Sequence, residues 1–212
     1  MQYSSELENY IQAHSSNELP VLNHILRQSH LKMVNPRMVS GHIQGLLLIM
    51  LSQLVKPLKI LEIGTYTGYS AICLAHGLQK DGKLQTIEIN DEIAEFAKEN
   101  FIEAQLENTI IQHIGSALKI IPILADTFDI IFIDGEKREY PAYFELCKDK
   151  LRSGGLLIAD NVLWDGKVVN PLALDESATK AVMEFNDKIQ IDPTFENVLL
   201  PIRDGIMLAR KI

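Results

Sequence analysis

Acidic side chains end two short apolar segments in the middle of the sequence. Asp134 ends FDIIFID, and Asp160 with Asn161 ends LLIADN. If these segments are neighbouring parallel strands, their ends lie about 4.8 Å apart and the three oxygen donors converge. Close carboxylates repel unless a cation or proton lies between them, and oxygen ligands without His or Cys favour Mg²⁺, with Ca²⁺ or Mn²⁺ as alternatives. The alternative is that these residues only cap a loop and a helix.

A glycine turn follows an earlier apolar segment, LKILEIG. Gly64 lets the backbone turn tightly and approach a ligand, and Gly68 eases the start of a helix. A dinucleotide site would need glycine where Glu62 and Thr67 stand, so a nicotinamide cofactor is disfavoured. Glu88 ends the next apolar segment, where a carboxylate can accept both ribose hydroxyls. The turn and this acid predict an adenosyl-type ligand without phosphates. The alternative is a plain strand-to-helix turn.

The elements that must position these residues alternate along the chain. Helical spacing predicts two helices within residues 4–30 and an apolar one at 38–54. Continuous apolar runs predict strands at 58–64, 83–89, 109–115, 128–135 and 156–162, separated by helices at 69–78, 91–101, 117–124 and 140–152, the last stopped by Gly154 and Gly155. An irregular stretch (163–174), a helix (177–191) and a hairpin (196–202 and 205–212) follow. This order predicts an α/β fold with a doubly wound, mostly parallel sheet.

Composition narrows the class of protein. The chain has 212 residues, 47% hydrophobic and 23% charged, with a net charge of −8 and two cysteines. We therefore expect one domain, in which residues 1–54 cover the site and 55–212 form the core. No signal-peptide pattern or membrane span is predicted, so a cytoplasmic location is expected. The acidity disfavours a polyanionic partner.

The combined motifs resemble those of the cation-dependent class I O-methyltransferases that use S-adenosylmethionine. This family includes catechol and caffeoyl-CoA O-methyltransferases. The residues that carry the resemblance are LEIGTYTGYS (61–70), IEIN (87–90), GSAL (115–118), FDIIFIDGEK (128–137) and LLIADNVLWDGKV (156–168). The resemblance implies a Rossmann-like fold with a seven-stranded sheet in the order 3-2-1-4-5-7-6, and a homodimer.

The family also implies roles for individual residues. Asp134, Asp160 and Asn161 match the metal ligands, and Lys137 matches the position proposed as general base. Burial and the cation would have to lower the pKa of Lys137 for that role. Trp164 is expected to form an aromatic wall and Asp165 to contact the acceptor, where plant relatives usually have Asn. Cofactor contacts are implied at Val39, Ser40, Glu62, Gly64, Thr65, Ser70, Glu88, Ala117, Asp134 and Glu136.

The expected function is methyl transfer to a small catechol-like or hydroxylated aromatic acceptor. A second hypothesis is methylation of a hydroxyuridine in tRNA, to which the locally basic stretch Arg27, His30, Lys32 and Arg37 could contribute. The net charge disfavours tRNA without excluding it. A third hypothesis, a non-catalytic adenosyl-binding scaffold, conflicts with the intact set of Asp134, Lys137, Asp160 and Asn161.

Overall fold

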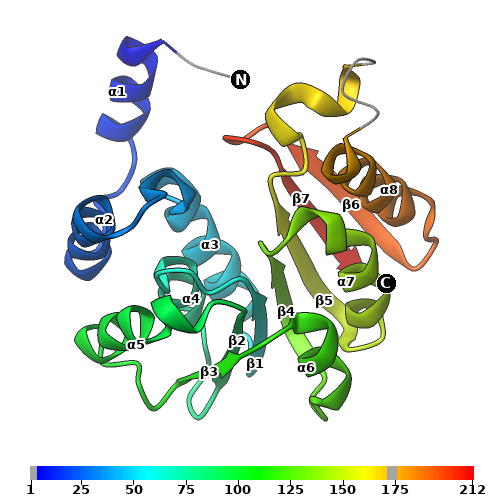
Figure 1. Ribbon diagram of the computed structural model, residues 1–212, viewed down its shortest axis with the longest axis horizontal. Coiled ribbons are helices and arrows are strands. Elements are labelled where there is room, and N and C mark those ends of the chain that lie inside the picture. The colour runs from blue at the N-terminus through cyan, green and yellow to red at the C-terminus, as the bar shows by residue number, and fades with distance from the viewer. Residues whose placement is uncertain (1–3, 171–175) are drawn as a thin grey trace.

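A seven-stranded sheet forms the centre of the protein (Figure 1). The computed structural model describes residues 4–170 and 176–212. The strand order is β3-β2-β1-β4-β5-β7-β6, which confirms the predicted topology. β1 to β5 pair in parallel, while β7 runs antiparallel to β5 and β6. The strands are β1 (Lys59–Ile63), β2 (Lys83–Glu88), β3 (Ile110–Ile114), β4 (Phe128–Ile133), β5 (Leu151–Asp160), β6 (Phe195–Leu200) and β7 (Ile206–Lys211).

The strand register explains why distant acids meet at one edge of the sheet. Ile63 pairs with Ile133, and Ile133 pairs with Ala159, so β1, β4 and β5 end level with one another. Gly64, Asp134 and Asp160 are the next residues along these strands. The carboxyl ends of central parallel strands are where ligands bind in open α/β sheets.

Helices cover both faces of the sheet (Figure 1), because its strands are apolar on both sides. One face carries α3 (His42–Val55), α4 (Tyr69–Ala75) and α5 (Ala94–Glu103), with α2 (Pro20–Lys32) packed outside them and α1 (Ser5–Ala13) beyond. The other carries α6 (Ala117–Ile123), α7 (Tyr140–Lys148) and α8 (Ser177–Ile191). Two hydrophobic clusters, one on each face, make up the core.

The apolar helix α3 packs one of its sides into the fold. Among the described residues, Pro36–Val55 is the one helical stretch long and apolar enough to cross a membrane by length and composition alone. Its residues Leu48 and Ile49 are buried in the core, and α3 packs against α4. Met50 and Leu54 remain exposed on the opposite side. This pattern is typical of a helix that packs against the core and keeps some apolar side chains exposed to solvent.

Several predicted boundaries are wrong. The helix expected from residue 38 begins at His42, because Gly41 at its N-terminus has φ +77° and Pro36–Met38 forms a separate 3₁₀ turn. The helix expected to run to residue 152 ends at Lys148, and β5 already begins at Leu151. The glycines expected to stop that helix therefore lie inside the strand. The irregular stretch contains a 3₁₀ segment, Trp164–Val169, and its residues 171–175 lie outside the described residues.

Candidate functional site

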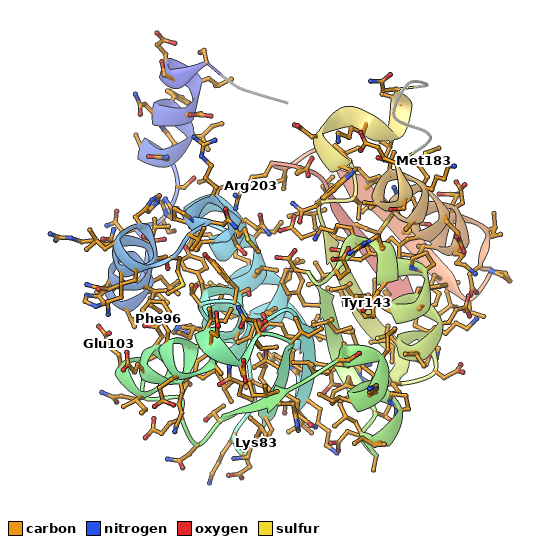
Figure 2. All side chains as sticks on the ribbon, viewed as in Figure 1. Lys83, Phe96, Glu103, Tyr143, Met183 and Arg203 are labelled. Carbon is orange, nitrogen blue, oxygen red and sulfur yellow. The ribbon has the colours of Figure 1, made fainter. Side chains whose placement is uncertain are left out.

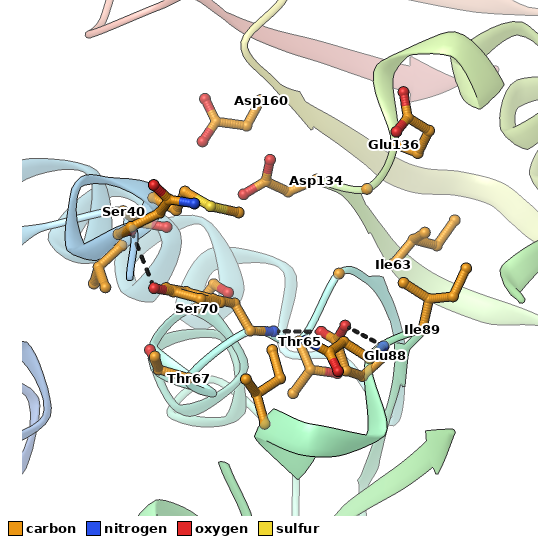
Figure 3. Close-up of a pocket in the computed structure, with 18 of the residues that line it drawn as sticks. Ser40, Ile63, Thr65, Thr67, Ser70, Glu88, Ile89, Asp134, Glu136 and Asp160 are labelled. Atoms are coloured by element: carbon orange, nitrogen blue, oxygen red, sulfur yellow. Dashed lines mark hydrogen bonds between the residues drawn. The ribbon is translucent and has the colours of Figure 1, made fainter. Parts of the chain in front are cut away.

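An open cavity of about 1240 Å³ lies at the carboxyl ends of β1, β2, β4 and β5. Residues 33–40, between α2 and α3, run along one side of it, and we call this segment the strap. Figure 3 shows acidic side chains from the ends of β2, β4 and β5 around one space, with hydroxyl side chains from the strap and from α4 beside them. Predicted site residues that line it are Val39, Ser40, Gly64, Thr65, Ser70, Glu88, Ala117, Asp134, Glu136, Lys137, Asp160, Asn161 and Trp164. The exceptions are Glu62 and Asp165.

Gly64 brings the backbone of β1 against the end of β4. Its φ is +101°, and a Cβ added there would lie 2.2 Å from the carbonyl oxygen of Asp134. Two backbone hydrogen bonds explain this approach: the Gly64 amide donates to Ile87 at 2.9 Å, and the Asp134 amide donates to Ile63 at 2.8 Å. Only glycine meets both requirements, since a side chain would be strained and would clash. Glycine at this position therefore lets the turn pack directly against the end of β4, where both line the cavity.

Glu88 lies across this turn with both carboxylate oxygens held in place. Oε2 accepts the Tyr66 amide at 2.8 Å, and Oε1 accepts the Asn90 amide at 2.9 Å (Figure 3). The residue is only 7% exposed. Each oxygen still has a free lone pair, because a carboxylate oxygen accepts about two hydrogen bonds. Glu88 is thus a preoriented acceptor for a pair of hydroxyl donors.

Glu62 lies below the cavity instead of lining it, which corrects its predicted place among the contact residues. It is fully buried in β1. The Thr86 hydroxyl donates to Oε2, while Oε1 has no partner among the described residues. Burial raises the pKa of Glu62 to about 8, outweighing the hydrogen bond from Thr86, which lowers it. Glu62 is therefore mainly protonated at neutral pH.

We expect the stability of the protein to fall between about pH 4.5 and pH 8 because of Glu62. In that range the folded protein keeps a proton on Glu62 that the unfolded chain releases, so the free energy of unfolding decreases as the pH rises. One proton accounts for at most about 1.4 kcal/mol per pH unit. Urea unfolding from pH 5 to 9 should show a flatter profile for Glu62→Gln than for wild type. The exposed Glu99→Gln serves as control, and equal slopes in all three proteins would contradict the assignment.

Lys137 and Asp134 form a partly buried ion pair. Lys137 Nζ donates to Asp134 Oδ1 at 2.9 Å and to the Tyr140 hydroxyl at 2.7 Å. Burial alone would lower the pKa of Lys137, but Asp134 and Tyr140 outweigh it and the net shift is upward. Burial raises the pKa of Asp134 to about 6, with Lys137 opposing and Asp160 adding to the rise. Both partners are therefore charged at neutral pH, and without the cation the protein does not lower the pKa of Lys137 as the general-base role requires.

Asp160 faces Asp134 across the cavity (Figure 3). It is 5% exposed; Oδ1 accepts the Asn161 amide at 2.7 Å, and Oδ2 accepts Gln44 Nε2 at 2.6 Å. Asn161 follows with φ +58° and also lines the cavity. In residues 4–170 and 176–212, no three His, Cys, Asp or Glu side chains gather as a metal site. The predicted donor set has two carboxylates and one amide, and these hard oxygen donors fit Mg²⁺, Ca²⁺ or Mn²⁺.

The segment after β5 forms the far wall of the cavity. Trp164 and Asp165 both have positive φ, at +47° and +55°. Trp164 lines the cavity, and its indole Nε1 is buried without a hydrogen-bond partner in the described structure. Asp165 is exposed, outside the cavity lining, and its amide donates to Asp204 Oδ1. Of the two residues predicted to contact the acceptor, Trp164 lines the cavity, whereas Asp165 lies outside the lining and bonds to Asp204.

Sequence reasoning missed two polar residues of the site. Gln44, which is 1% exposed, lies in the helix that the sequence predicts only from its apolar residues. Arg203 lies in the turn of the predicted hairpin. Arg203 lines the cavity and donates to the backbone of the strap. The available signal was an arginine in a tight turn, where Gly or Asn is the usual residue.

Comparison with known proteins identifies the family. The O-methyltransferase family model matches residues 12–212. The catechol O-methyltransferase of Niastella koreensis is 40% identical over 78% of this chain and 79% of its own. The O-methyltransferase of Bacillus cereus, solved in complex with SAH, has a TM-score of 0.90 and 28% identity, with 98% of this chain and 97% of that one covered. TomG of Streptomyces achromogenes, involved in tomaymycin synthesis and solved with SAM, has a TM-score of 0.90 and 30% identity over 97% and 96%. The chain belongs to the O-methyltransferase family.

Proposed function

We propose that this O-methyltransferase transfers the methyl group of S-adenosylmethionine to a hydroxyl of a small catechol-like acceptor, with a divalent cation bound at Asp134, Asp160 and Asn161. The observation that carries the proposal is the facing pair of Asp134 and Asp160 in the same cavity as Glu88 and the Gly64 turn. The identity to a catechol O-methyltransferase and the likeness to proteins solved with SAM or SAH support it.

The β1–β2 end of the cavity suits the donor. Glu88 offers two fixed oxygens to the ribose hydroxyls, and the turn at Gly64 lines the space for the methionine portion. Ala117 begins α6 next to this end, with its small side chain leaving space for the adenine. An acidic lining suits a ligand that carries a sulfonium and an ammonium but no phosphate.

The β4–β5 end suits the acceptor. A divalent cation held by Asp134, Asp160 and Asn161 would lower the pKa of an acceptor hydroxyl and fix its oxygen. Lys137 Nζ, fixed by Asp134 and Tyr140, places a positive charge beside this end and would stabilise the oxyanion that attacks the methyl group. Trp164 would pack against an aromatic ring and exclude water. In this proposal Lys137 acts through its charge, whereas the family resemblance implies a general base at this position.

The test is methyl transfer from labelled S-adenosylmethionine to a panel of catechols, with Mg²⁺ and then with EDTA. We expect turnover with vicinal diols, loss of at least about tenfold with EDTA, and recovery when Mg²⁺ is restored. Monohydroxy analogues are the matched control, because they lack the second chelating oxygen. Activity that survives EDTA would contradict the metal, and transfer to tRNA but not to catechols would contradict the acceptor class.

A further inference from the structure

Arg203 connects the C-terminal hairpin to the strap. It lies in the turn between β6 and β7 (Figure 2), 163 residues along the chain from Ser40. Nη1 donates to the carbonyls of Val39, at 2.9 Å, and Ser40, and Nη2 donates to that of Arg37 at 3.3 Å. One guanidinium therefore holds three carbonyls of the segment that borders the cavity.

The same guanidinium reaches Asp160 through one intermediate. Arg203 Nη1 lies 3.4 Å from Gln44 Oε1, and Gln44 Nε2 donates to Asp160 Oδ2 at 2.6 Å. An amide fixed at its oxygen cannot flip without losing a hydrogen bond, so its NH₂ group must face Asp160. Gln44 is buried, and its bond to a carboxylate is charge-assisted. Gln44 thus connects the Arg203 side chain to Asp160.

Backbone geometry shows that Arg203 is held in a conformation that arginine seldom adopts. Its φ is +51°, a region that favours glycine. The next residue, Asp204, accepts hydrogen bonds from the amides of Leu163 and Asp165, which belong to the segment after β5 on the opposite side of the cavity. The turn Arg203-Asp204 therefore bonds to both sides of the cavity, one residue to each side. A turn residue with positive φ whose side chain makes several hydrogen bonds to a distant segment is typical of a functional constraint.

We propose that Arg203 is a positioning residue that holds the strap over the cofactor site and, through Gln44, fixes the orientation of Asp160. The roles of the strap and Asp160 rest on the proposed function, whereas the contact between Arg203 and the strap does not. No side chain of the strap is needed for this contact, because Arg203 binds its backbone carbonyls.

Arg203→Gly is the sharpest variant, because glycine tolerates φ +51° and removes the guanidinium together with the rest of the side chain without straining the turn. Hydrogen exchange of the ligand-free protein should accelerate about tenfold or more at the Met38 and Val39 amides, which bond within the strap to Asn35 and Pro36. Arg203→Lys should restore part of the protection, since its ammonium can reach a carbonyl. Arg210→Ala, which removes an arginine paired with Glu196 on the same hairpin, should change nothing. Unchanged strap exchange in Arg203→Gly would overturn the proposal.

A second measurement separates the two effects of Arg203. Binding of SAH by calorimetry should weaken about tenfold in Arg203→Gly and stay within about twofold in Gln44→Leu, while Mn²⁺ affinity should fall about tenfold in both. In steady state, Arg203→Gly should raise the KM for S-adenosylmethionine and lower kcat, and Gln44→Leu should lower only kcat. Normal Mn²⁺ affinity in both variants would overturn the link to Asp160. If wild type binds neither ligand, the proposed function fails, while the exchange result still decides the contact with the strap.

Discussion

Asp160→Asn is expected to lower kcat about a thousandfold while the affinity for SAH stays within about twofold of wild type. The change keeps the shape of the side chain and removes its charge. Asp160 ends β5 and faces Asp134, whereas the oxygens proposed to bind the ribose belong to Glu88 at the end of β2. Loss of the Asp160 charge should therefore weaken cation binding and acceptor activation without changing the affinity for the methyl donor.

Three measurements check this expectation. Calorimetry gives the affinity for SAH, titration gives the affinity for Mn²⁺, and single-turnover kinetics give the rate of methyl transfer. Asp187→Asn, an exposed acid on α8, is the control for loss of one negative charge. Thermal unfolding shows whether the fold is intact, since the amide can replace only one of the two hydrogen bonds that Asp160 accepts from Asn161 and Gln44. Equal losses of SAH affinity and turnover would contradict a division of the cavity into donor and cation ends.

The sheet and the strand-end acids could be predicted because local patterns determine them. Continuous apolar runs identify buried parallel strands, and the register then places Asp134 beside Gly64 and Asp160 without further information. Glycine is a less certain signal. Gly154 and Gly155 were expected to stop a helix, but they lie in β5 next to an irregularity in its pairing with β4. Glycine is common both at β-bulges and at helix ends because it can adopt positive φ, so its presence alone does not distinguish the two.

The rest of the site depends on contacts between residues far apart in sequence. Gln44 and Asp160 are 116 residues apart, and Arg203 is 159 residues from Gln44. No periodicity or motif links them, because only the folded structure brings Gln44 of α3 close to the end of β5 and to the turn between β6 and β7. Lys137 differs, since its partner Asp134 is three residues away. There the sequence contained the contact, and the charge of Asp134 opposes the lowering of the Lys137 pKa that a general base would need.

The second large expected effect concerns Lys137, and it distinguishes a general base from a fixed cation that stabilises the oxyanion. A general base must be neutral before it accepts a proton, and arginine, which stays charged, cannot replace it. A fixed cation that stabilises an oxyanion needs only its charge, so arginine can replace it in part. Because Asp134 and Tyr140 raise the pKa of Lys137, we expect the second behaviour.

Lys137→Met is therefore expected to lower kcat about a hundredfold to a thousandfold, whereas Lys137→Arg keeps at least about a tenth of wild-type kcat. Both variants should bind SAH normally, because Lys137 contacts Asp134 and Tyr140 and not Glu88. Lys148→Met is the matched control, since Lys148 pairs with Glu145 at the same spacing on α7 but away from the cavity. The measurement is kcat across pH 6 to 9 with saturating Mg²⁺. If Lys137→Arg is as inactive as Lys137→Met, the electrostatic role is wrong and the general-base role is favoured.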